Sequence, residues 1–416
     1  MLNKVKALLQ KYKSLLSNLG YLTVIKSFNL ILPLVIFPYL LRVLGAEKYG
    51  LVVFAESIIT YMVILVGFGF GLSATKELSI NRDHKEKVNE LVSSVYIIKG
   101  VIFLLCVILF FLMLPFFSEY VKHKLLFLIT MHLVLYEFLF PFWYFQGVEK
   151  MKYITYLELI GKITFIGLIL FYIKSPEDYL LVPAFQGIGS FISIIGGFYI
   201  MFYYEKVKFI IPSTSIIKKN AKESLLYFTS TLSIQVFANS NRFFIGSYIG
   251  MTSLAHYDIV AKIIKILSVP TTLLRTILIP FVAKNKDKRV IRNVTKIMFV
   301  ASIFIIGFIF LWARDIVYTI THKYEEDIIY FLKIYTFIIL LYNLSNYYLV
   351  VGLNSFGHEK VFMKIMVYSM LLYLFLIVIV ILNSLFFVEC FIISLIMVEL
   401  FIVFKTYYEG YKRKIL

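Results

Sequence analysis

Four basic residues concentrate in two neighbouring apolar stretches in the second half of the chain, namely Arg242, Lys262, Lys265 and Arg275. Placing a cation in an apolar membrane environment costs free energy, so basic residues in such stretches are functional candidates by default. Guanidinium and ammonium groups also form strong, charge-assisted hydrogen bonds to phosphate oxygens. The four residues are therefore candidates for a cationic, substrate-binding face between the helices.

Polar residues at helical spacing accompany these cations. Gln235, Asn239 and Arg242 are spaced i, i+4 and i+7, so they share one face of a helix. Asp258 and Lys262 form an i, i+4 pair on the next apolar stretch. This second face can form an ion pair and, with a further lysine one turn beyond, keep a net positive charge. The alternative is a structural pair that only compensates buried charge.

The first half of the chain holds further candidates. Lys26 and Asn29 lie three residues apart in the first apolar stretch, and Lys99 lies in the third. We expect them to join the cationic site, with snorkelling of the lysines to the membrane surface as the alternative. Glu56 and Asp258 are the carboxylates that we expect to bind a coupling ion, H+ or Na+. For Glu56 a hydrogen-bonded structural role is the alternative.

The composition shows which kind of element must hold these side chains. Apolar residues make up 61% of the 416 residues and charged residues 16%, against about 25% charged in an ordinary soluble domain. A membrane-spanning helix needs roughly 20 apolar residues, so the chain has enough for about twelve. A soluble enzyme, a disordered chain and a disulfide scaffold are excluded, and continuous apolar runs argue against an outer-membrane barrel.

We therefore expect an all-α polytopic membrane protein with about twelve transmembrane helices in two six-helix lobes. The predicted spans are residues 19–41, 49–70, 92–114, 125–145, 154–173, 179–203, 224–249, 254–283, 294–313, 327–351, 361–381 and 385–404. The predicted organisation is a basic amphipathic interfacial helix (1–18), an N-terminal lobe (19–204), a basic cytoplasmic connector (205–223), a C-terminal lobe (224–404) and a basic cytoplasmic tail (405–416).

Loop charges predict the orientation of the spans. With a cytoplasmic N-terminus, the inside segments carry 25 lysines and arginines and the outside loops carry 7. Because basic residues collect in cytoplasmic loops, we expect both termini in the cytoplasm. The net charge of +18 then reflects topology and contact with anionic lipids, and no nucleic-acid partner is expected.

Catalytic and metal-binding motifs are absent from the sequence. It contains no P-loop, no GxSxG and no HExxH motif, and the loops are too short for a folded domain. Cys106 and Cys390 both lie in apolar runs and provide no metal-ligand cluster. We expect no enzymatic activity, no metal and no cofactor, so any function must be carried out between the helices.

A weak internal repeat follows when Gly45 is aligned with Gly250. The alignment superposes the first span on the seventh, and each glycine leads into a helix start that contains tyrosine. Two parallel six-helix repeats are the layout of a transporter with a cavity between two lobes.

Five segments, taken in order, resemble bacterial polysaccharide repeat-unit flippases of the multidrug/oligosaccharidyl-lipid/polysaccharide exporter superfamily. They are RVLGAEKYG (42–50), GFGFGLSATK (67–76), FWYFQGVEKM (142–151), NRFFIG (241–246) and YDIVAKI (257–263).

The resemblance implies a flippase that moves undecaprenyl-pyrophosphate-linked oligosaccharide repeat units from the inner to the outer leaflet of the bacterial plasma membrane by alternating access. Such units serve the synthesis of surface polysaccharide such as O-antigen or capsule. The expected partners are this lipid-linked glycan and anionic lipids, with polysaccharide polymerase or chain-length proteins as further candidates.

Two alternatives remain open. A multidrug antiporter of the same superfamily should have an acid-rich cavity for cationic drugs, whereas the predicted spans hold ten bases against seven acids. An integral-membrane enzyme of polysaccharide assembly needs sizeable outside loops with catalytic side chains, and the short loops argue against it.

Overall fold

The computed structural model describes residues 13–113, 121–272 and 286–413, together with residues 274, 275, 278 and 282. Most of the predicted interfacial helix (1–18) and the last three residues of the predicted tail lie outside the described residues. The side chains of Lys26 and Asn29 lie outside them as well.

Every regular element in the described part of the chain is a helix. The first half contains α2 (Lys13–Gly67), α3 (Phe70–Asn81), α4 (Lys85–Met113), α6 (Lys124–Thr130), α7 (His132–Leu139), α8 (Phe142–Gly147), α9 (Met151–Tyr172), η2 (Pro176–Leu180), α10 (Leu181–Phe198) and η3 (Tyr199–Tyr204). The second half contains α11 (Thr214–Tyr248), α12 (Met251–Leu267), α14 (Lys288–Thr321), α15 (Glu326–Tyr335), α16 (Phe337–Asn346), η4 (Tyr347–Asn354), α17 (Glu359–Leu382) and α18 (Val388–Lys412).

The predicted all-α, multi-pass membrane class is confirmed. Eight helical segments within the described residues are long and apolar enough to cross a membrane. The number of twelve spans and the cytoplasmic location of both termini stay predictions.

The predicted loop between the first two spans is almost entirely helical. Residues 42–48 belong to α2, and the only break is at Gly45, with φ of 75° and ψ of 164°. Glycine adopts this backbone conformation without steric strain because it has no Cβ. Gly250, with φ of 130°, has the corresponding place between α11 and α12.

The described chain divides into two compact units whose boundaries fall inside long helices. The first unit comprises residues 13–32 and Ala55–Thr231, and the second comprises Pro33–Phe54 and residues 232–413. Helices α2 and α11 therefore each contribute to both units.

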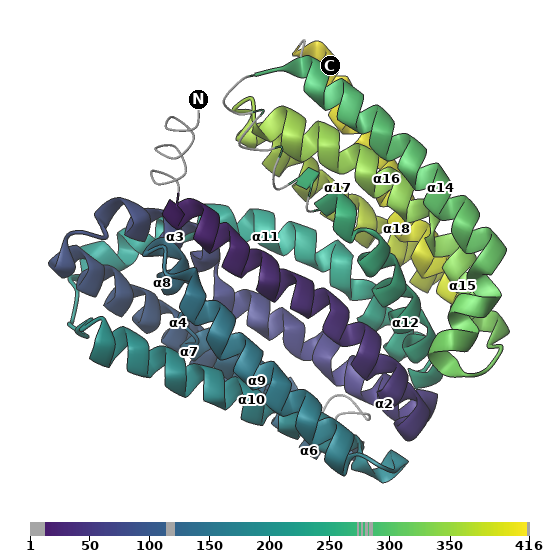
Figure 1. Ribbon diagram of the computed structural model, residues 1–416, viewed down its shortest axis with the longest axis horizontal. Coiled ribbons are helices and arrows are strands. Elements are labelled where there is room, and N and C mark those ends of the chain that lie inside the picture. Colours follow the sequence, from purple (N-terminus) through teal and green to yellow (C-terminus); the bar gives the residue numbers. More distant parts are fainter. Residues whose placement is uncertain are drawn as a thin grey trace. The chain divides into compact units, whose positions relative to one another are not determined.

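The first unit is packed around α9 and α10, which lie side by side (Figure 1). Their backbones approach closely where Gly161 faces Gly189, since a Cβ at Gly161 would lie 2.4 Å from the Gly189 carbonyl oxygen. A second contact joins α3 and α8, around the buried side chains of Phe70, Trp143 and Phe145.

The second unit is packed around α16, α17 and α18 (Figure 1). Buried polar groups connect its helices: Asn241 of α11 donates a hydrogen bond to the Phe391 carbonyl of α18 and accepts one from the Tyr373 hydroxyl of α17. Buried polar side chains need such partners, so these two bonds hold α11 against α17 and α18.

Candidate functional site

Asp258 is the centre of a polar cluster inside the second unit. Its side chain is 1% exposed. Arg242 Nε donates a hydrogen bond to Oδ1 at 2.8 Å, and Lys262 Nζ and the Tyr49 hydroxyl donate to Oδ2. One carboxylate therefore accepts hydrogen bonds from two cations and one phenol. We call Tyr49, Arg242, Asp258 and Lys262 the Asp258 cluster.

Lys262 has two further contacts in this cluster. Its Nζ donates to the Tyr49 hydroxyl oxygen at 2.7 Å and lies 2.9 Å from the centre of the Phe37 ring. A cation over an aromatic face is attracted by the ring quadrupole. The ammonium group is thus held between a carboxylate, a hydroxyl group and a ring, beside a small hollow of about 20 Å³.

Close packing of two helix starts brings these residues together. A Cβ at Gly50 would lie 1.9 Å from the Met251 carbonyl oxygen, so the backbone of α2 directly contacts the start of α12. A Cβ at Gly246 would meet the Phe54 ring at 2.4 Å. Because both positions lack a side chain, Tyr49 can reach a carboxylate 209 residues further along the chain.

The charge of the cluster is positive. Arg242 and Lys262 share the one carboxylate of Asp258, and their side chains are 27% and 16% exposed. Lys265 lies one turn beyond Lys262 on α12 and is exposed. A ligand that reaches this face meets three cations and one fully buried acid.

The predicted polar face of α11 forms a connected chain of hydrogen bonds. Arg242 Nη1 donates to Asn239 Oδ1 at 3.2 Å, and Asn239 Nδ2 donates to Gln235 Oε1 at 2.7 Å. The structure thus brings together Gln235, Asn239, Arg242, Asp258 and Lys262. Their role in substrate binding stays a prediction.

The other predicted site residues lie elsewhere. Arg275 donates to Asn346 Oδ1 of α16, within the second unit. Lys99 belongs to the first unit, where its ammonium group is almost fully buried and lies 2.9 Å from Glu137 Oε1. Glu56 also belongs to the first unit and is partly buried.

Two features of the cluster were not anticipated from the sequence. Tyr49 lies at the start of a predicted span and has no predicted role in the site, and Phe37 is one of many aromatic residues. Both contacts depend on packing between distant segments, which helical spacing does not report. Within the described residues, no group of three or more His, Cys, Asp or Glu side chains converges on a metal site.

The fold has counterparts among solved membrane transporters. It is similar to an inward-facing MATE multidrug-resistance transporter of the MOP superfamily, with a TM-score of 0.73, 15% identity, and coverage of 92% of this chain and 94% of that chain. It is also similar to the lipid II flippase MurJ, with a TM-score of 0.71, 17% identity and coverage of 92% and 86%. The chain therefore shares the fold of these multi-pass membrane proteins.

Sequence comparison identifies the family. The chain belongs to the polysaccharide biosynthesis protein family, whose model matches residues 15–286. A protein of Escherichia coli (strain K12) named as an O-antigen transporter is 26% identical over 373 residues, which are 88% of this chain and 89% of that protein. The resemblance drawn from the sequence segments is confirmed.

Proposed function

We propose that the chain translocates undecaprenyl-pyrophosphate-linked oligosaccharide repeat units from the inner to the outer leaflet of the bacterial plasma membrane. Family membership and the relative named as an O-antigen transporter support this class of substrate. The anionic pyrophosphate and the polar glycan cannot cross the hydrocarbon core unaided. The protein must therefore offer positive charge and hydrogen bonds within the membrane.

The Asp258 cluster is the observation that carries the proposal. Arg242 and Lys262 are only partly exposed, and both depend on one carboxylate for compensation. A pyrophosphate group has several anionic oxygens, so it can pair with both cations at once. Asp258 would hold the two cations in place while the site is empty, and the substrate would share or replace it when bound.

The transport cycle that we propose is alternating access between two six-helix lobes, residues 19–204 and 224–404. Substrate shifts the balance between inward-open and outward-open states only by binding one of them more tightly. The difference in affinity between the two states would come from cations among Arg242, Lys262, Lys265 and Arg275. Glu56 and Asp258 are the carboxylates to test for coupling to H+ or Na+.

Complementation of surface polysaccharide tests the proposal. Arg242→Ala and Lys262→Ala should each abolish surface polymer in a strain that lacks its own copy, while immunoblotting shows normal insertion. Lys364→Ala removes one exposed cation from α17 and serves as the matched control, which should restore polymer like the unchanged protein. Full polymer export by both cluster variants would overturn the role of the cations.

A drug-efflux measurement separates the rival function. MATE transporters share the fold, so efflux of cationic dyes from the same strain is the relevant readout. We expect no dye resistance from this chain, because the cluster carries excess positive charge and repels cations. Dye efflux without restored polymer would favour the antiporter.

A further inference from the structure

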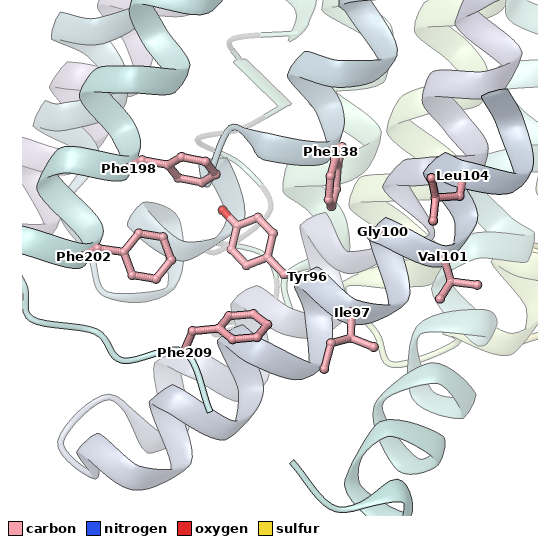
Figure 2. Close-up of a pocket in the computed structure, with 9 residues that line it drawn as sticks. All are labelled: Tyr96, Ile97, Gly100, Val101, Leu104, Phe138, Phe198, Phe202 and Phe209. Carbon is pink, nitrogen blue, oxygen red and sulfur yellow. The ribbon is translucent and has the colours of Figure 1, made fainter. Parts of the chain in front are cut away.

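An apolar groove opens on the surface of the first unit. It is bordered by α4, α7, α10, η3 and the segment 205–213, and its volume is about 480 Å³, within the ~300–1,000 Å³ usual for small-ligand sites. Figure 2 shows five aromatic and three aliphatic side chains around it, together with one glycine. They are Tyr96, Phe138, Phe198, Phe202, Phe209, Ile97, Val101, Leu104 and Gly100.

The side chains that line this groove offer almost no hydrogen-bonding groups to a ligand. The one hydroxyl group among the lining side chains belongs to Tyr96, and it donates to the Leu139 carbonyl oxygen at 2.9 Å. Gly100 lines the groove without a side chain, and a Cβ there would be in ordinary van der Waals contact with the Phe138 ring at 3.4 Å. The groove therefore suits a hydrocarbon chain and not a sugar or a headgroup.

The groove is continuous with an exposed apolar surface along α4. Val101, Leu104 and Ile108 are 55%, 60% and 55% exposed, and they follow one another at helical spacing. In a membrane-spanning helix these side chains face hydrocarbon. A chain bound in the groove could thus extend along α4 into the bilayer.

The chain segment that contributes Phe209 to the groove is basic. Phe209 belongs to the segment between η3 and α11, in which Lys206 and Lys208 are both exposed. The neighbouring acid, Glu205, is compensated by an ion pair with Lys150. The first turns of α4 contain two lysines and two glutamates, whose charges cancel. The net positive charge of the segment is therefore unchanged.

Two hydrogen bonds fix the charged segment against α4. The backbone N–H of Lys208 donates to Asn89 Oδ1 at 2.9 Å, and the backbone N–H of Ile210 donates to Ser93 Oγ at 2.9 Å. Phe209 lies between these two anchored residues and lines the groove. The position of the lysines relative to the groove is therefore set by the fold of the first unit itself.

We propose that this groove binds one acyl chain of an anionic phospholipid whose phosphate group contacts Lys206 and Lys208. The occupant follows from the combination of an apolar groove with two exposed lysines in the segment that contributes Phe209. Basic pockets beside membrane helices bind anionic headgroups, and each lysine near the surface strengthens binding by about fivefold. A zwitterionic lipid with the same chains gains the apolar contacts but not this electrostatic attraction.

Native mass spectrometry of the full-length protein tests the headgroup. Delipidated protein is titrated with dioleoyl phosphatidylglycerol and, separately, with dioleoyl phosphatidylcholine, which has identical chains. We expect one phosphatidylglycerol to bind at least tenfold more tightly than phosphatidylcholine. Lys206→Gln with Lys208→Gln should remove this preference, whereas the matched pair Lys360→Gln with Lys364→Gln should keep it. Equal binding of both lipids to the unchanged protein would overturn the proposal.

A second variant tests the groove. Gly100→Leu places a side chain in the channel and should eliminate the preferred phosphatidylglycerol. Gly307→Leu is the matched control, because Gly307 lies on an exposed face of α14 with open space around its Cβ position. Size-exclusion chromatography checks that both proteins fold. If Gly100→Leu does not fold, the lipid preference of the Lys206→Gln, Lys208→Gln variant still decides. Retention of the lipid by a folded Gly100→Leu variant would also overturn the proposal.

Discussion

The Tyr49 hydroxyl group donates a hydrogen bond to Asp258 Oδ2 at 2.7 Å and accepts one from Lys262 Nζ at 2.7 Å. A phenol has one proton to donate and lone pairs to accept, so both bonds can exist together. Tyr49 is buried, and it joins the helix that follows the Gly45 break to the helix that follows Gly250. This tyrosine thereby connects the starts of the two helices that the weak internal repeat relates.

Removing the Tyr49 hydroxyl should weaken the cluster without opening a cavity. Tyr49→Phe deprives the buried carboxylate and the lysine of one partner each, and an unsatisfied buried polar group costs about 1–3 kcal/mol. We expect a lower Tm in detergent and reduced surface polymer. Tyr368→Phe on α17 is the control, since that side chain is 51% exposed and should tolerate the change. An unchanged Tm for Tyr49→Phe would show that the two hydrogen bonds add no stability.

Removing the carboxylate should cost more than removing the hydroxyl group. Asp258→Asn leaves Arg242 and Lys262 without an anion, and breaking a buried ion pair by deleting one partner costs about 3–5 kcal/mol. The partial exposure of both cations reduces this figure. Adding Lys262→Met to Asp258→Asn removes one uncompensated charge and should restore part of the lost Tm. A double variant less stable than Asp258→Asn alone would contradict this account of the charges.

The contact between the two helix starts should depend on the missing side chain of Gly50. Gly50→Ala places a methyl group within 1.9 Å of the Met251 carbonyl oxygen, and such overpacking costs about 1–3 kcal/mol or more. Gly71→Ala on α3 is a suitable control, because nothing lies within 4 Å of its Cβ position. We expect thermal unfolding to shift downward only for Gly50→Ala.

Helical spacing predicted the faces of α11 and α12 but not the contacts between them. Gln235, Asn239 and Arg242 lie within α11, and Asp258 and Lys262 lie within α12. Within a single helix, neighbours at i, i+3 and i+4 meet. Tyr49 meets Asp258 only through packing of α2 on α12, and a single sequence carries no signal for that register. The same limit applies to Lys99, whose acidic partner lies 38 residues away.

Apolar run length predicted membrane helices but not their internal breaks. The stretch predicted as one span over residues 125–145 forms α6, α7 and α8, which are separated at Met131 and around Pro141. The break at Pro141 agrees with the missing backbone N–H and fixed φ of proline. At Met131 the backbone stays helical, with φ of −58° and ψ of −14°, so α6 and α7 follow one another as a nearly continuous helix.

The ion pair inside the first unit should respond asymmetrically to loss of its two partners. The Lys99 side chain is 2% exposed, whereas that of Glu137 is 36% exposed. Glu137→Gln leaves a buried ammonium group without an anion, and water cannot reach it. Lys99→Met leaves a carboxylate that can hydrate. We therefore expect Glu137→Gln to lower the Tm in detergent more than Lys99→Met does, by an amount equivalent to about 1–3 kcal/mol. The reverse order would mean that the lysine stabilises the unit through its buried aliphatic stem and not through its charge.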